Sequence, residues 1–81
     1  MFKDQKVLVT GGAGMIGRQL VSLLLEKGAD VHVADLKHPK DMADKVTFHK
    51  VDLRDFYGCI KLCEGMDYVF NLVGMKAQMY M

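Results

Sequence analysis

The sequence predicts an α/β domain built on a parallel β-sheet of strand order 3-2-1-4, with helices on both faces. Apolar, β-branched segments alternate with segments of helical periodicity, glycines mark several of the turns, and 51% of the 81 residues are hydrophobic. This alternation is typical of parallel strands joined by right-handed crossovers. The length suits one small domain, which we expect to span residues 1–81.

The first half of the chain predicts two strands and a helix. Residues 6–10 form a short apolar strand, and residues 30–35 form the second. Residues 15–27 predict a helix, because apolar residues recur there at three- and four-residue spacing. Its inner face is expected to carry Ile16, Leu20, Val21, Leu23 and Leu24. Gly28 then occupies the position of a C-cap glycine.

The second half follows a polar loop over residues 37–45. Residues 46–51 predict the third strand, residues 54–64 a helix, and residues 67–73 the fourth strand. Residues 75–81 are compatible with the start of another helix. The inner face of the helix over residues 54–64 is expected to carry Leu53, Phe56, Tyr57, Ile60 and Cys63.

The predicted fourth strand is nearly apolar throughout, which is typical of a strand covered on both faces and flanked by neighbours. No strand is predicted after it, and an exposed apolar edge is a liability. We therefore expect either the front part of a longer protein or a sheet completed by a second chain in a homo-oligomer.

Composition argues against several classes of partner. The net charge is +1 and the 11 basic residues are spread along the chain, so neither nucleic acid nor a membrane surface is indicated. No apolar run approaches the ~20 residues of a membrane span. The first six residues are charged and lead directly into a strand, so we expect no signal peptide and a cytoplasmic location.

Two cysteines, Cys59 and Cys63, lie four residues apart in the predicted helix over residues 54–64. A disulfide at this spacing would need awkward geometry, and a metal site would need further ligands, whereas the histidines are scattered. We expect two buried structural thiols and no metal.

A glycine-rich turn joins the first strand to the first helix. Gly11 permits a tight turn at the strand end, Gly14 allows phosphates to approach the backbone, and Gly17 allows close packing of the helix. The free N–H groups at the start of such a helix attract a diphosphate. The pattern therefore predicts a dinucleotide site, although glycine turns that bind nothing are also common.

Asp35 ends the second strand, where a carboxylate accepts hydrogen bonds from both ribose hydroxyls and repels a 2′-phosphate. This favours NAD over NADP as the cofactor. Lys37 lies close enough to complicate the choice, and Arg18 falls just after the glycines. The alternative is an acid that only caps a turn at the strand end.

Residues 10–17, Thr-Gly-Gly-Ala-Gly-Met-Ile-Gly, resemble the Thr-Gly-x-x-Gly-x-x-Gly signature of the extended short-chain dehydrogenase/reductases, the NAD-dependent epimerase/dehydratase family. Many members act on nucleotide sugars. The resemblance implies a Rossmann-type domain of which about half is present here. It implies NAD as cofactor, but it specifies no substrate.

The resemblance extends to two later segments. Asp52 would accept from the adenine amino group and Leu53 would contact the ring. The structural alternative is that Asp52 is a helix N-cap and Asp55 adds charge to the first turn, and both roles are compatible. After the fourth strand the cofactor would pass over the chain, where Val73 replaces a usual alanine. The predicted cofactor-binding residues are Gly11, Gly14, Met15, Ile16, Gly17, Asp35, Leu36, Asp52, Leu53, Leu72, Val73 and Gly74.

The resemblance also implies catalysis by a tyrosine and a lysine four residues later, beyond a fifth strand that this chain does not reach. Tyr57 and Lys61 have that spacing, but they lie between the third and fourth strands, and we expect Tyr57 to be a core residue. We therefore predict no turnover and weak binding of the adenosine-diphosphate half of NAD. The alternatives are a non-catalytic NAD(P)-binding or redox-sensing module, and a self-associating fragment without a ligand.

Overall fold

The computed structural model describes residues 2–37, 42, 44–52, 54–72 and 78–80. Within them the chain forms five strands and two helices. In chain order these are β1 (Lys6–Thr10), α1 (Met15–Glu26), β2 (Asp30–Asp35), β3 (Thr47–Lys50), α2 (Phe56–Cys63), β4 (Tyr68–Asn71) and β5 (Gln78–Tyr80).

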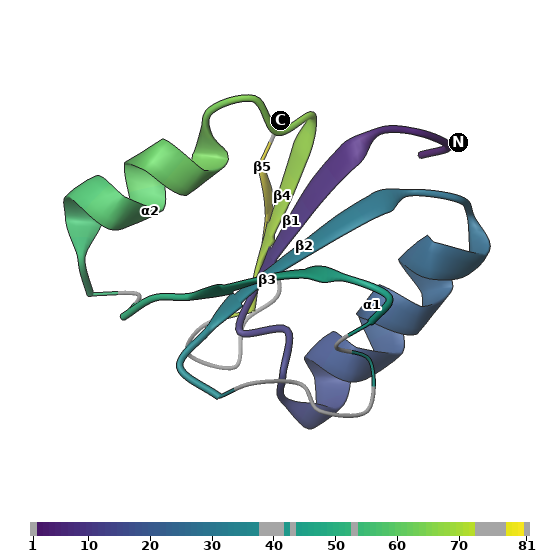
Figure 1. Ribbon diagram of the computed structural model, residues 1–81, viewed down its shortest axis with the longest axis horizontal. Coiled ribbons are helices and arrows are strands. Elements are labelled where there is room, and N and C mark those ends of the chain that lie inside the picture. The colour runs from purple at the N-terminus through teal and green to yellow at the C-terminus, as the bar shows by residue number, and fades with distance from the viewer. Residues whose placement is uncertain (1, 38–41, 43, 53, 73–77, 81) are drawn as a thin grey trace.

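The strands form one sheet of order β3-β2-β1-β4-β5 (Figure 1). The first four strands of this order are parallel, which confirms the predicted order 3-2-1-4. Val7 of β1 lies between Val31 of β2 and Tyr68 of β4 in the register. Because the four strands are parallel, their carboxyl ends share one edge of the sheet.

Two predictions for the end of the chain are wrong. The segment expected to begin a helix contains the strand β5, and the edge of β4 that we expected to be unpaired is bonded to it. The pairing is antiparallel and sets Val69 against Tyr80 and Asn71 against Gln78. β5 supplies the backbone partners that a central strand requires on both sides. Residues 75–77 and 81 lie outside the described part of the chain.

The hydrophobic core lies between α1 and one face of the sheet. Alternate residues of β1 and β2 point to this face, and Val21 and Leu24 of α1 pack against them. Two residues predicted for the inner face of α1 are instead exposed, Ile16 by 61% and Leu23 by 50%. Ile16 directly precedes the buried Gly17, and Leu23 directly precedes the buried Leu24. Because neighbouring residues of an α-helix are rotated by about 100° around its axis, Ile16 and Leu23 lie to the side of the buried face.

The end of α1 confirms the predicted C-cap glycine. Gly28 has a φ of +81°, a conformation that favours glycine. The Gly28 N–H donates to the Leu25 carbonyl at 3.0 Å, and the Ala29 N–H donates to the Leu24 carbonyl at 3.1 Å. This pair of hydrogen bonds is a Schellman motif, which turns the chain directly into β2.

α2 lies on the opposite side of the sheet from α1 (Figure 1). Its predicted inner face is wrong: Tyr57 and Ile60 are 80% and 44% exposed, and Cys63 is exposed. The less exposed residues are Gly58, Cys59 and Leu62, which lie on one side of the helix. A Cβ on Gly58 would lie 2.8 Å from Asp55 Oδ2 and 3.4 Å from a Val51 side-chain carbon, so the lack of a side chain here leaves room for the capping carboxylate of Asp55. Leu53 and the Phe56 side chain lie outside the described part.

The two thiols are therefore not the buried pair that the sequence predicted. Cys59 is half-buried and Cys63 is exposed, and neither forms a disulfide. Burial raises the pKa of the Cys59 thiol, with smaller contributions from the charges of Asp55, Cys63 and Asp52. Cys59 therefore remains a protonated, weakly nucleophilic thiol at neutral pH.

Candidate functional site

The glycine turn leads from the carboxyl end of β1 into α1. Gly11 has a φ of +74°, and its N–H donates to the Ala34 carbonyl of β2 at 2.8 Å. Gly14 is the N-cap of α1, and its N–H donates to the Gly11 carbonyl at 3.3 Å. A Cβ added to Gly14 would meet only that carbonyl oxygen, at 3.6 Å. Gly14 therefore presents bare backbone to open space.

Gly17 and Gly12 bring α1 into direct contact with the turn. A Cβ on Gly17 would lie 2.6 Å from the Gly12 Cα and 2.7 Å from the Gly11 carbonyl oxygen. Gly12, for which no role was predicted, is buried. A Cβ there would lie 2.9 Å from Val33 and 3.2 Å from Val9 side-chain carbons. In the sequence, only the adjacent pair Gly11-Gly12 pointed to a special role for Gly12. Its contact with Val33 could not be foreseen, because Val33 belongs to a different strand, β2.

The start of α1 has the electrostatic character of an anion site. Gly14 provides no side-chain cap, and the first turn contains no acidic residue, so no side chain of α1 itself compensates the positive end of the helix. Met15 and Ile16 in this turn are 80% and 61% exposed. A diphosphate would satisfy the amides at this position without displacing a side-chain cap.

Asp35 ties the end of β2 to the glycine turn. Its Oδ2 accepts a hydrogen bond from the Ala13 N–H at 3.2 Å. Its Oδ1 accepts from the Leu36 N–H at 2.7 Å and from the Lys37 N–H at 3.2 Å. The carboxylate therefore does cap its own turn, as the alternative held. It also reaches the turn expected to hold phosphate, a contact that the sequence analysis did not foresee.

Asp52 follows β3 and is held by Arg54. The Arg54 backbone N–H donates to Asp52 Oδ1 at 2.9 Å, and the guanidinium donates to both carboxylate oxygens at 2.8–3.2 Å. The side-chain hydrogen bonds are the main cause that lowers the pKa of Asp52 to about 2, followed by the backbone hydrogen bond. Asp52 is therefore an anion at every pH where the protein would be studied.

The N-cap of α2 is Asp55 rather than Asp52. The Gly58 N–H donates to Asp55 Oδ1 at 3.1 Å, and α2 begins at the next residue, Phe56. The alternative role predicted for Asp52, a helix N-cap, is therefore wrong. Asp52 remains outside the helix at the carboxyl end of its strand.

The end of β4 lies beside the glycine turn. The Leu72 N–H donates to the Thr10 carbonyl at 3.0 Å, and a Cβ on Gly11 would lie 3.5 Å from the Leu72 carbonyl carbon. The Thr10 hydroxyl, mostly buried, donates to Asn71 Oδ1 at 2.7 Å, a contact that the sequence analysis missed. Leu53, Val73 and Gly74, all predicted to touch cofactor, lie outside the described residues.

Four segments that are distant in the sequence thus meet along one edge of the sheet. Following the strand order, they are Asp52 after β3, Asp35 at the end of β2, the glycine turn after β1, and Leu72 after β4. Ligands of open α/β sheets bind outside the carboxyl ends of the strands. The order of the segments runs from an acid, through a second acid, to the glycine turn before α1 and then to Leu72.

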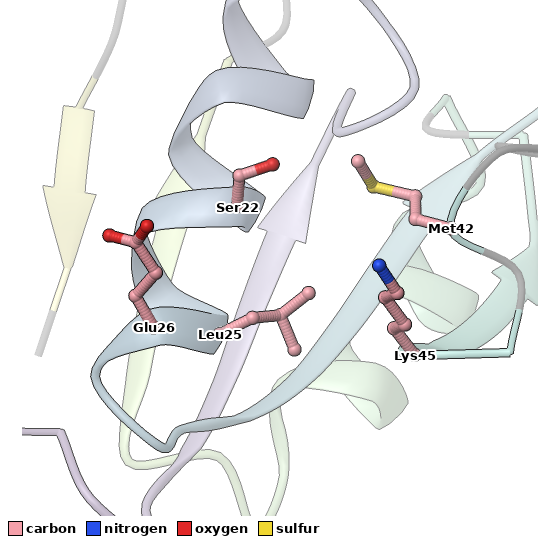
Figure 2. Close-up of a pocket in the computed structure, with 5 residues that line it drawn as sticks. All are labelled: Ser22, Leu25, Glu26, Met42 and Lys45. Carbon is pink, nitrogen blue, oxygen red and sulfur yellow. The ribbon is translucent and has the colours of Figure 1, made fainter.

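A hollow of about 510 Å³ lies away from this edge, beside the last turns of α1. Figure 2 shows Ser22 and Leu25 pointing toward the segment that carries Met42 and Lys45, whereas Glu26 points away from it. The hollow shares no residue with the four segments at the carboxyl edge. We assign no ligand to it.

Other kinds of site find no support in the described residues. Among them, no group of three or more His, Cys, Asp or Glu side chains could hold a metal ion. No helix within these residues is long and apolar enough to cross a membrane. Tyr57, expected in the core, is 80% exposed in the first turn of α2.

A histidine pair lies on the sheet between β2 and β3. His32 Nδ1 and His49 Nε2 are 3.0 Å apart, and the two rings are stacked. His32 Nε2 lies 3.5 Å from Asp30 Oδ1. Burial, followed by the charge of His32, lowers the pKa of His49 below its usual value of 6.5.

We expect the free energy of unfolding to fall as the pH drops below about 6.5. Since the folded pKa of His49 is lowered, the unfolded chain binds protons more readily, and stability present above that pH is lost below it. Urea unfolding at pH 7.5 and pH 5.5 measures the change, and His49→Gln should reduce it. An unchanged pH dependence in His49→Gln would contradict the assignment to this residue.

Comparison with known proteins identifies relatives of this arrangement. The sequence model of the NAD dependent epimerase/dehydratase family matches residues 7–79. GDP-mannose 3,5-epimerase of Arabidopsis thaliana is 37% identical over 73 residues, which cover 86% of this chain and 19% of the plant protein. UDP-glucose 4-epimerase uge1 of Schizosaccharomyces pombe is 39% identical over 83 residues, covering 88% of this chain and 23% of the yeast protein.

Solved structures also include proteins that are similar to this chain in both sequence and fold. The Bordetella bronchiseptica enzyme WbmF, solved in complex with NAD+, superposes with a TM-score of 0.71 at 35% sequence identity. The match covers 88% of this chain and 23% of WbmF. The chain thus spans about a fifth of the length of the curated relatives that it matches.

Proposed function

Since the chain belongs to the NAD-dependent epimerase/dehydratase family, we propose that residues 1–81 form part of a dinucleotide-binding domain and bind NAD at the carboxyl edge of the sheet. One observation carries the proposal: Asp52, Asp35, the glycine turn and Leu72 follow one another across four adjacent strand ends. This order matches the order of adenine, ribose, diphosphate and nicotinamide along an extended dinucleotide.

Each segment has a chemical role in this proposal. The diphosphate would lie against Gly14 and accept hydrogen bonds from the first amides of α1, at Met15, Ile16 and Gly17. Asp35 would accept from the ribose hydroxyls, beside Leu36. Asp52 would face the adenine amino group, with Leu53 against the ring. Leu72, Val73 and Gly74 would line the path toward the nicotinamide.

The longer protein of which such a domain forms part would transfer a hydride between a substrate carbon and the nicotinamide. The named relatives are epimerases of GDP-mannose and UDP-glucose, which supports a nucleotide sugar as the substrate class. NAD supplies the hydride chemistry when it is bound. The 81-residue chain alone is expected to bind dinucleotide without turnover, since we assign no residue of it to proton transfer.

Titration of the chain with NAD and NADP, followed by NMR, tests the proposal. We expect NAD to bind more tightly than NADP, because Asp35 would repel a 2′-phosphate. Asp35→Ala should weaken NAD binding by about tenfold, since hydrogen bonds to a charged group are lost. The same variant should reduce the preference for NAD over NADP.

The control for this variant is Asp44→Ala, which removes an exposed acid that precedes β3. We expect it to leave the affinity for both dinucleotides unchanged. If Asp35→Ala bound NAD as well as the wild type, the role of this carboxylate would be refuted. If NADP bound better than NAD to the wild type, the choice of cofactor would be wrong.

Two further expectations remain predictions. A cytoplasmic location can be checked by fractionation of cells that produce the chain. A homo-oligomer can be checked by size-exclusion chromatography with light scattering, although β5 occupies the edge of β4 on which we based that expectation.

A further inference from the structure

The carboxylate proposed to face adenine is already occupied within the chain. Asp52 Oδ1 accepts from the Arg54 backbone N–H at 2.9 Å and from Nε at 3.0 Å. Asp52 Oδ2 accepts from Nε at 3.2 Å and from Nη2 at 2.8 Å. A carboxylate offers about four lone-pair positions, so these contacts use nearly all of its acceptor capacity. A purine amino group would have to share an oxygen with Arg54.

Arg54 brings unused donors to the same place. A guanidinium has five N–H donors, of which the contacts above engage one on Nε and one on Nη2. In the part of the chain that the structure describes, no contact of Nη1 is seen. The Arg54 side chain is 89% exposed, whereas that of Asp52 is 40% exposed. The guanidinium therefore adds donors beside the carboxylate, on the solvent side of the pair.

We infer that Asp52 and Arg54 act as one donor–acceptor pair toward the purine base, and that Arg54 allows the site to accept a 6-oxo purine as well as a 6-amino purine. The inference rests on the proposed binding of NAD. A carboxylate alone accepts a hydrogen bond from the 6-amino group of adenine. It repels the oxygen of a 6-oxo purine and can accept only from the N1–H beside that oxygen, so the 6-oxo group itself needs a separate donor. The pair meets either base, since Asp52 accepts from one and Arg54 donates to the other.

The fixed geometry of the pair favours arginine over any other cation. The planar guanidinium engages both carboxylate oxygens at once and keeps its remaining donors in the same plane. A lysine would keep the charge but not this fork. The side-chain hydrogen bonds to Asp52, followed by its charge, also raise the pKa of Arg54, so its donors stay protonated.

NMR titration of the ¹⁵N-labelled chain with NAD and with nicotinamide hypoxanthine dinucleotide, its 6-oxo analogue, tests the inference. We expect the wild type to bind the two with affinities within about threefold, because a donor is present for each base. Arg54→Ala should weaken the analogue by about tenfold, since a charged hydrogen bond is lost, and NAD by less than about threefold. The ratio of the two affinities is the readout, because general damage to the fold would change both affinities together.

Lys61→Ala is the matched control, since it removes one positive charge from the last turn of α2. It should leave the ratio unchanged, whereas Arg54→Lys should give a ratio between those of the wild type and Arg54→Ala. An Arg54→Ala ratio equal to that of the wild type overturns the inference. A wild-type preference for NAD above about tenfold also overturns it, because a donor would then be absent for the 6-oxo group.

The two proposals fail in different ways. If the wild type bound neither dinucleotide, the proposed function itself would be refuted. If it bound NAD and Asp35→Ala weakened this binding, while the ratio stayed constant across the Arg54 variants, only the inference about Arg54 would be refuted. Should Arg54→Ala fail to fold by circular dichroism, the ratio in Arg54→Lys decides, and a wild-type value there overturns the inference.

Discussion

Gly17→Ala is expected to destabilise the chain by about 3 kcal/mol, the upper part of the usual range for overpacking. The new Cβ would lie 2.6 Å from the Gly12 Cα and 2.7 Å from the Gly11 carbonyl oxygen. Both are backbone atoms, which cannot move without separating α1 from the turn. An alanine inside a helix ordinarily stabilises by about 1 kcal/mol relative to glycine, so the steric term decides the sign. For a domain of this size, that loss is a large part of its total stability.

Urea unfolding followed by circular dichroism measures this effect, with Gly14→Ala as the matched control. Gly14 has a φ of −77°, which any residue adopts, and its Cβ would face open space. Alanine is a slightly poorer N-cap than glycine, which destabilises the variant, but it also lowers the entropy of the unfolded chain, which stabilises it. Because these effects nearly cancel, we expect the free energy of unfolding to change by no more than about 0.5 kcal/mol. Equal stabilities of the two variants would show that α1 does not rest on the turn as described.

Gly14→Ala has its large effect on the ligand instead. If the diphosphate lies against the backbone of the turn, a methyl group on Gly14 occupies the space it needs, and NAD binding should fall by about tenfold or more. The same NMR titration measures the affinity, and the unfolding curve of the variant shows that the fold is intact.

A second control separates the phosphate contact from a general change in the turn. Adenosine lacks phosphate and would bind only at the adenine and ribose end, so its affinity should not change in Gly14→Ala. Undiminished binding of NAD by this variant would place the diphosphate elsewhere. A parallel loss of adenosine binding would instead indicate that the whole edge had been disturbed.

The sequence predicted the parallel part of the fold because its signals are local. Residues 6–10 and 30–35 are β1 and β2 within the predicted bounds, since β-branched runs bounded by polar residues leave little alternative. β5 was not predicted because three residues are too few to show a periodic pattern. Its pairing with β4 depends on the tertiary fold, which the local sequence does not reveal. The side of α2 that approaches the sheet was missed for a similar reason, since the tertiary fold decides which face of a helix is covered.

The candidate site likewise contains features that the local sequence predicts and features that depend on the tertiary fold. The spacing of Gly11, Gly14 and Gly17 follows from the chemistry of a tight turn before a helix, so sequence alone suggests it. The contact of Ala13 with Asp35 depends on two strands lying side by side, and the occupation of Asp52 by Arg54 depends on side-chain conformation. Neither has a sequence signature, because many exposed acid–arginine pairs two residues apart make no such contact.

The short antiparallel strand at the end of the sheet has a consequence for how the chain behaves at high concentration. If the apolar strand β4 were an edge of the sheet, its unpaired backbone groups would offer a template for pairing with further molecules. β5 covers that strand, and among the described residues the outer strand on this side is three residues long, while β3 at the other edge is four residues long. Edge strands this short are poor templates for growth, so the millimolar samples that NMR needs should stay clear.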